Sequence, residues 1–213
     1  MTDSDRQIGY FSPPNIGWLE FELTDQEMDY VWRCIENKKR SMKYQLAGNI
    51  DNSYELIDRG DWFYINVIIP LIDCYGGKVR DLGTKSSLPT RHPLYMREWW
   101  VNYQKQNEFN PIHNHAGVYS FVIWMKIPYH SKKQNQKDIA RNSNNAQIGN
   151  FQFLYTNILG EPMSYEYHLN PDLEGTILFF PSNLNHQVYP FYDCSEDRIS
   201  VSGNIVLDTS RKL

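Results

Sequence analysis

The feature that most constrains the fold of this chain is a change of pattern near Trp99. From there onward the sequence consists of short segments rich in β-branched and aromatic residues, most of them separated by turn residues, as at Asn170–Asp172 and Pro181–Asn183. Eight short strands in about 110 residues predict an antiparallel sandwich or barrel of the jelly-roll type. We expect these strands at residues 98–105, 109–113, 117–127, 150–156, 163–168, 175–180, 186–191 and 198–207.

Two helices are predicted ahead of these strands. Thr24–Glu27 has the form of a capping box, and the apolar stripe that follows predicts a helix whose last turn is the cationic Lys38–Arg40. The apolar segment 61–75, closed by Gly76-Gly77, predicts a second helix that Pro70 kinks or ends early. The other segments are expected to be an edge strand over 18–23, a loop over 45–54, irregular connections over 1–18 and 76–94, and a mobile polar loop over 131–150 at one mouth of the barrel.

These elements predict an α+β fold that is mainly β. We expect a single domain over 1–213, in which an N-terminal helical support (1–96) braces a jelly-roll core (97–207). The net charge of −4 does not favour a nucleic-acid partner, no apolar run has the length of a membrane span, and the first residues do not form a signal peptide. Three cysteines without CxxC spacing indicate reduced thiols, so we expect a cytoplasmic protein, and the sequence does not indicate its oligomeric state.

The motif with the clearest chemistry is His113-x-His115, in the segment Pro111–Phe121. On an extended strand, two histidines one residue apart point the same way, so both imidazoles could reach one metal ion. His186, which lies 71 residues beyond His115 (186 − 115), is the candidate third ligand. Imidazole binds Fe(II), Zn(II), Cu(II) and Ni(II), and three protein ligands leave positions for a co-substrate and dioxygen. Alone the motif is weak, because two histidines on a strand can also form an ordinary polar edge.

Arg198 follows His186 by 12 residues (198 − 186) and opens the last predicted strand. A buried guanidinium is costly without an anion, and its fork of donors matches a carboxylate. A dicarboxylic acid that chelates the metal at one end would supply that anion at the other, and Ser200 would point the same way as Arg198. The alternative is a salt bridge from Arg198 to Asp193, Glu196 or Asp197 at the preceding turn.

Residues 97–207 resemble the 2-oxoglutarate and Fe(II)-dependent oxygenases. The segments Gly175–Ser182, His186–Val188 and Arg198–Asn204 look like the C-terminal half of these enzymes. Asn110–Gly117, followed by Tyr-Ser-Phe-Val-Ile-Trp, is similar to the metal-binding segment of a branch with an HxH motif, found in bacterial and cyanophage genomes and loosely named prolyl-hydroxylase-like.

The resemblance implies a double-stranded β-helix in which His113, His115 and His186 hold Fe(II). Arg198 and Ser200 would take the distal carboxylate of 2-oxoglutarate, and further polar contacts to this co-substrate would come from Tyr103, Asn102 and Asn204. The usual ligand set is two histidines and a carboxylate. There are therefore two possibilities for the metal ligands. Either all three histidines bind the ion, or His115 faces away and a carboxylate or water completes the coordination shell of the metal. The implied reaction is hydroxylation of a C–H bond, coupled to the conversion of 2-oxoglutarate and dioxygen into succinate and carbon dioxide.

The sequence leaves three hypotheses for the function of the protein. The first is a 2-oxoglutarate-dependent dioxygenase that hydroxylates an unidentified substrate, either a protein or peptide side chain or a small molecule, in the cytoplasm (the host's, if the gene is phage-encoded). The second is a cupin-type three-histidine enzyme such as a thiol dioxygenase, against which Val118 and Tyr119 stand where many cupins have a glutamate. The third is a jelly-roll binding or structural protein without turnover.

Overall fold

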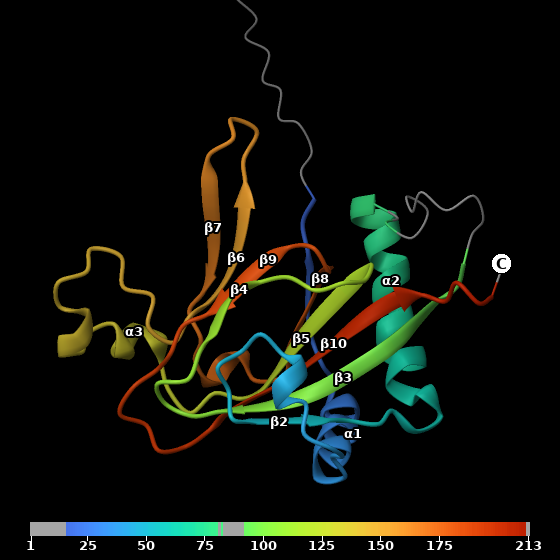
Figure 1. Cartoon of the computed structure of the whole chain (residues 1–213), viewed down its shortest axis with the longest axis horizontal. Coiled ribbons are helices and arrows are strands. Elements are labelled where there is room, and N and C mark those ends of the chain that lie inside the picture. The colour runs from blue at the N-terminus through green and yellow to red at the C-terminus, as the bar shows by residue number, and fades with distance from the viewer. Residues whose placement is uncertain (1–15, 81, 83–91, 212–213) are drawn as a thin grey trace, which may run out of the picture.

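The strands form two antiparallel sheets that face one another (Figure 1). The computed structural model describes residues 16–80, 82 and 92–211. The major sheet has the order β1-β8-β5-β10-β3-β2, and the minor sheet has the order β4-β9-β6-β7. The strands are β1 (Leu19–Glu22), β2 (Asn52–Glu55), β3 (Leu94–Gln104), β4 (Asn110–His113), β5 (Tyr119–Lys126), β6 (Phe151–Thr156), β7 (Pro162–Tyr167), β8 (Thr176–Pro181), β9 (Asn185–Val188) and β10 (Arg198–Leu207).

The eight strands expected in the C-terminal half are all present, as β3 to β10, and they form the double-stranded β-helix. The edge strand expected over 18–23 is β1, which pairs with β8 at one edge of the major sheet. Along the strands, successive side chains point to opposite faces. In β5, Ile123 packs toward the helices, whereas Val122 and Trp124 pack between the two sheets. This alternation creates two cores, one on each face of the major sheet.

Helix α1 (Asp25–Glu36) begins at the predicted capping box, in which the Thr24 side chain accepts a hydrogen bond from Glu27 N and the Glu27 side chain accepts one from Thr24 N. The predicted last turn at Lys38–Arg40 was wrong, because α1 ends at Glu36. The backbone of this triplet pairs instead with β2: Lys39 N donates to Glu55 O at 2.7 Å, and Glu55 N donates to Arg40 O at 3.0 Å. These bonds take the place of the helical hydrogen bonds that would continue α1.

The second helical segment runs through Pro70 without ending. It consists of a π-helical stretch (Tyr64–Ile68), α2 (Ile69–Tyr75) and a second π-helical stretch (Gly76–Arg80). Proline lacks an amide donor and crowds the preceding turn, and the wider π-helical turn directly before it accommodates both effects. Gly76-Gly77 was wrongly expected to close this helix, since the backbone stays helical beyond it. Both helices cover the outer face of the major sheet, as Figure 1 shows for α2.

The expected loop over 45–54 was wrong at its end, because Asn52–Glu55 forms β2 and pairs with β3. Most of the expected irregular connections, 1–15, 81 and 83–91, lie outside the described residues. The polar stretch 131–150 contains helix α3 (Ser131–Gln134) and is tied to the core by reciprocal hydrogen bonds between the Gln134 side chain and the Tyr192 backbone. In the described ranges, no helix has both the length and the apolar character that crossing a membrane requires.

Candidate metal centre

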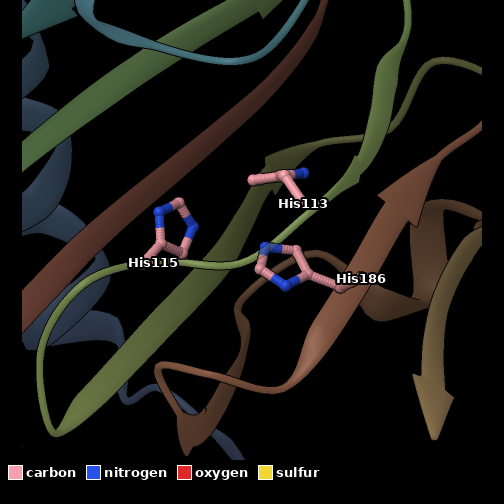
Figure 2. Close-up of side chains that lie close together, drawn as sticks. All are labelled: His113, His115 and His186. Atoms are coloured by element: carbon pink, nitrogen blue, oxygen red, sulfur yellow. The ribbon is translucent and has the colours of Figure 1, made fainter.

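Three histidines meet between the two sheets, at the edge of the minor sheet where β4 pairs with β9. His113 is the last residue of β4 and lies directly opposite His186 of β9 in the antiparallel register. His115 comes from the loop that follows β4 (Figure 2). One ring nitrogen from each residue lies within 4.8 Å of the others, a separation that allows all three to bind one ion.

The two histidines of the HxH motif converge for a different reason than strand periodicity. Because β4 ends at His113, His115 does not continue a strand. Its backbone N–H instead donates to Ser182 O at 2.8 Å, which brings the loop back against the turn between β8 and β9. Gly117 permits this path, since it has φ +148° and a Cβ there would lie 2.8 Å from the carbonyl oxygen of Ile205.

Two of the three imidazoles have a fixed tautomer. Nδ1 of His113 lies 2.8 Å from Pro111 O, and Nδ1 of His186 lies 2.9 Å from Leu184 O. A carbonyl oxygen only accepts, so both Nδ1 atoms carry the proton and both Nε2 atoms keep a lone pair for a metal ion. This is the arrangement by which protein groups orient metal-binding histidines.

All three imidazoles are held in the neutral form. Burial lowers the pKa of His113, and it lowers the pKa of His186 well below its ordinary value, with the neighbouring histidines adding to the effect. Burial, together with His113, lowers the pKa of His115 to about 4. Near neutral pH the cluster therefore presents uncharged donors, which a metal ion requires.

Arg198 lies at the start of β10 and is only 3% exposed. Nη1 donates to Tyr129 Oη at 3.0 Å, and Nη2 donates to the side-chain oxygen of Gln104. Nε is buried and has no hydrogen-bond partner among the described residues. A buried cation with an unsatisfied donor is costly, so this position fits an anionic ligand.

The alternative salt bridge at the preceding turn does not form. Asp193 pairs with Lys137 at 2.8 Å, and Glu196 pairs with Lys126 at 2.7 Å. Within the described ranges, no carboxylate lies within ion-pairing distance of Arg198. The positive charge of Arg198 is therefore not neutralised by the part of the chain that the structure describes.

A narrow cavity joins the histidines to Arg198. Of the candidate co-substrate residues, Ser200 and Asn102 line this cavity, and both are buried. Tyr103 does not, because it lies on the other face of β3 against Tyr54. Asn204 lines a separate cleft beside His115. The apolar part of the cavity wall consists of Ile50, Trp100, Phe121, Val122, Trp124, Phe151, Phe180 and Val188.

Three polar residues near the site were missed by the sequence reasoning. Gln104 lies two residues beyond Asn102 on the same face of β3, so strand periodicity could have indicated it. Tyr129 lies beyond the end of β5, and no sequence pattern pointed to it. Asn110 belongs to the segment Asn110–Gly117 and lines the cavity, and its buried Oδ1 has no hydrogen-bond partner in the part of the chain that the structure describes.

The fold and the site define a double-stranded β-helix protein with three histidines and a buried arginine around one cavity. A family model described as "Putative 2OG-Fe(II) oxygenase" matches residues 98–204, which is half of the chain, and the chain belongs to this family. Members are oxidoreductases of the dioxygenase type that use Fe(II), 2-oxoglutarate and dioxygen. No curated protein matches the sequence.

Similarity to a solved structure agrees with the family at the level of the fold. A prolyl-4-hydroxylase of Pseudomonas putida superposes with a TM-score of 0.52 at 15% identity, over 88% of this chain and 91% of that chain. HygX of Streptomyces hygroscopicus, solved with nickel, 2-oxoglutarate and hygromycin B bound, gives a TM-score of 0.48 at 11% identity, over 91% of this chain and 84% of that chain.

Proposed function

We propose that this protein hydroxylates its substrate at an Fe(II) ion held by His113, His115 and His186, with the distal carboxylate of 2-oxoglutarate bound by Arg198 and Ser200. The observation that carries the proposal is the buried guanidinium of Arg198, which shares a cavity with the histidines and has no ion-pair partner in the described ranges. Of the three functional hypotheses, family membership favours this one over a cupin-type enzyme or a protein without turnover.

The residues fit the two groups they would bind. The histidines offer neutral nitrogen donors, two of them with a fixed tautomer, and Fe(II) accepts imidazole ligands. Arg198 offers a planar fork of donors that matches a carboxylate. When bound, the iron would supply the redox chemistry that couples the oxidation of 2-oxoglutarate by dioxygen to hydroxylation.

The chain also controls water at the site. The aromatic wall, which includes Trp124, Phe151 and Phe180, is almost fully buried between the sheets. An apolar wall lowers the local dielectric constant, and this strengthens the interaction of Arg198 with a carboxylate. The same wall limits side reactions with water at the reacting centre.

The substrate would reach the metal from the other side of His115. A cleft of about 310 Å³ opens there, and its polar lining includes Gln45, Glu98 and Asn114. This volume is at the lower end of the range for small-molecule sites. We propose that the cleft receives a polar part of the substrate, which is either a protein or peptide side chain or a small molecule.

The proposal is tested by incubating the purified protein with Fe(II), a reductant and 2-oxoglutarate in air and measuring succinate. We expect succinate to form slowly without substrate and faster when a candidate substrate is present. His186→Ala serves as the matched control and should form none above the rate of free Fe(II). Succinate formation by the native protein no faster than by this variant, across pools of peptides and small molecules, would contradict the proposal.

A further inference from the structure

His115 differs from the other two histidines in how its ring is held. His113 and His186 each donate Nδ1–H to a backbone carbonyl two residues before them. The His115 ring forms no hydrogen bond with any residue of the described ranges, and its closest ring contacts are with His113, His186 and Trp100. Metal-binding histidines ordinarily have a second protein group beside them, so we expect such a group next to His115.

A chain of buried polar side chains runs from the backbone that holds His115 across three strands. His115 N donates to Ser182 O, and the hydroxyls of Ser182 and Ser120 share a hydrogen bond of 2.9 Å. Ser120 Oγ then donates to Asn204 Oδ1 at 2.8 Å, and Asn204 Nδ2 donates to Glu98 Oε1 at 3.0 Å. Ser182, Ser120 and Asn204 are each at most 3% exposed.

This polar chain ends on a carboxylate. Glu98 lies two residues before Trp100 on the same face of β3, and Trp100 contacts the ring of His115 at 5.8 Å between centroids. Glu98 and His115 line the same cleft. A buried polar network is costly unless each of its polar groups forms a hydrogen bond. Here Ser182, Ser120 and Asn204 each form one within the network, and the last of these bonds fixes Glu98 in place.

Glu98 brings a negative charge to the cleft, whereas the histidines beside it are neutral. Burial alone would raise the pKa of Glu98, but hydrogen bonds from Arg97 and Asn204 and the attraction of Arg97 hold that pKa below its usual value. Glu98 is therefore ionised near neutral pH. Since the three histidines are neutral, the cation they bind would gain no negative charge from its protein ligands.

We propose that Glu98 is the charge-balancing carboxylate of this metal centre: its negative charge, held in the cleft beside His115, offsets the charge of the bound cation from outside the ligand set. The inference rests on the proposed metal site. It assigns Asn204 and Ser120 to holding Glu98, and it gives the HxH motif a carboxylate on β3 of the facing sheet.

The test compares metal binding by Glu98→Gln and by the native protein. Metal-free proteins are titrated with cobalt(II), and both the affinity and the visible absorption spectrum of the bound ion are recorded. We expect Glu98→Gln to bind about 10- to 100-fold more weakly and to change the spectrum. Glu98→Asp, which keeps the charge, should restore most of the affinity.

Glu55→Gln is the matched control, since Glu55 also lies on a strand of the major sheet and pairs with an arginine, Arg40, at 2.9 Å. It should bind cobalt(II) like the native protein. If Glu98→Gln does not fold, Arg97→Met replaces it, because losing this exposed cation removes a positive charge that offsets the charge of Glu98 and should tighten binding by about two- to fivefold. Equal affinity of the folded variant and the native protein would overturn the inference, whereas a native protein that binds no metal would overturn the proposed function.

Discussion

Replacement of Arg198 by Met tests the co-substrate half of the proposed site. A guanidinium has five N–H donors. Two of these are used by Tyr129 and Gln104, so three (5 − 2) remain for a ligand, and one of them is the buried Nε–H. Arg198→Met removes these donors and the charge while it keeps an unbranched side chain that can fill the same space.

The expected loss follows from the bonds a carboxylate would make. Two charge-assisted hydrogen bonds contribute roughly 1.5–3 kcal/mol each, and removing one partner of a buried charge pair typically costs about 2–5 kcal/mol. The affinity for 2-oxoglutarate should therefore fall by at least about 30-fold. The affinity for the metal should change little, because Arg198 contacts none of the three histidines.

Both affinities are measured by calorimetric titration, first with nickel(II) and then with 2-oxoglutarate on the nickel-loaded protein. Arg40→Met, which removes an exposed arginine that pairs with Glu55, is the control and should bind both as the native protein does. Unchanged binding of 2-oxoglutarate by a folded Arg198→Met variant would refute the assignment of Arg198 to the carboxylate.

Three further outcomes are expected. His186→Ala should lose stoichiometric metal by elemental analysis, whereas His168→Ala, outside the cluster, should retain it; full occupancy in the first variant would remove His186 from the ligand set. The metal-free protein should lose stability as the pH falls from about 6.5 to about 4, because the unfolded chain binds protons to His115 in a window where the folded chain does not. The contribution of His115 is about 3 kcal/mol, and urea midpoints across this range that do not fall would contradict it. Thr24→Ala should lower the free energy of unfolding by about 1 kcal/mol through loss of the capping box, which urea denaturation measures, and an unchanged midpoint would show that the cap contributes nothing.

Strands of the C-terminal half such as β5, β6 and β8 could be predicted because each is a short apolar segment bounded by turn residues. Strand β2 could not, since its sequence Asn-Ser-Tyr-Glu lacks the apolar alternation of a strand and is fixed by pairing with β3. The end of α1 was missed for a related reason. The charges of Lys38–Arg40 suit a helix terminus, but the backbones of Lys39 and Arg40 form hydrogen bonds with Glu55 of β2 instead of continuing the helix.

The candidate site was predictable where residue type alone limits the chemistry, as for the histidines and Arg198. Strand periodicity would have separated Asn102 from Tyr103, because adjacent residues of a strand face opposite sides and only Asn102 lines the cavity. The partners of Arg198 depend on the approach of distant segments. Tyr129 lies 69 residues from Arg198 and Gln104 lies 94 residues from it, and local sequence carries no signal for contacts of that range.

The most direct test of the account is a crystal structure of the protein grown without oxygen in the presence of Fe(II) and 2-oxoglutarate. We predict one ion bound by Nε2 of His113 and His186 and by a ring nitrogen of His115, with the distal carboxylate of 2-oxoglutarate on Arg198. A metal ion bound elsewhere, or a 2-oxoglutarate molecule whose carboxylate does not contact Arg198, would contradict the central claim.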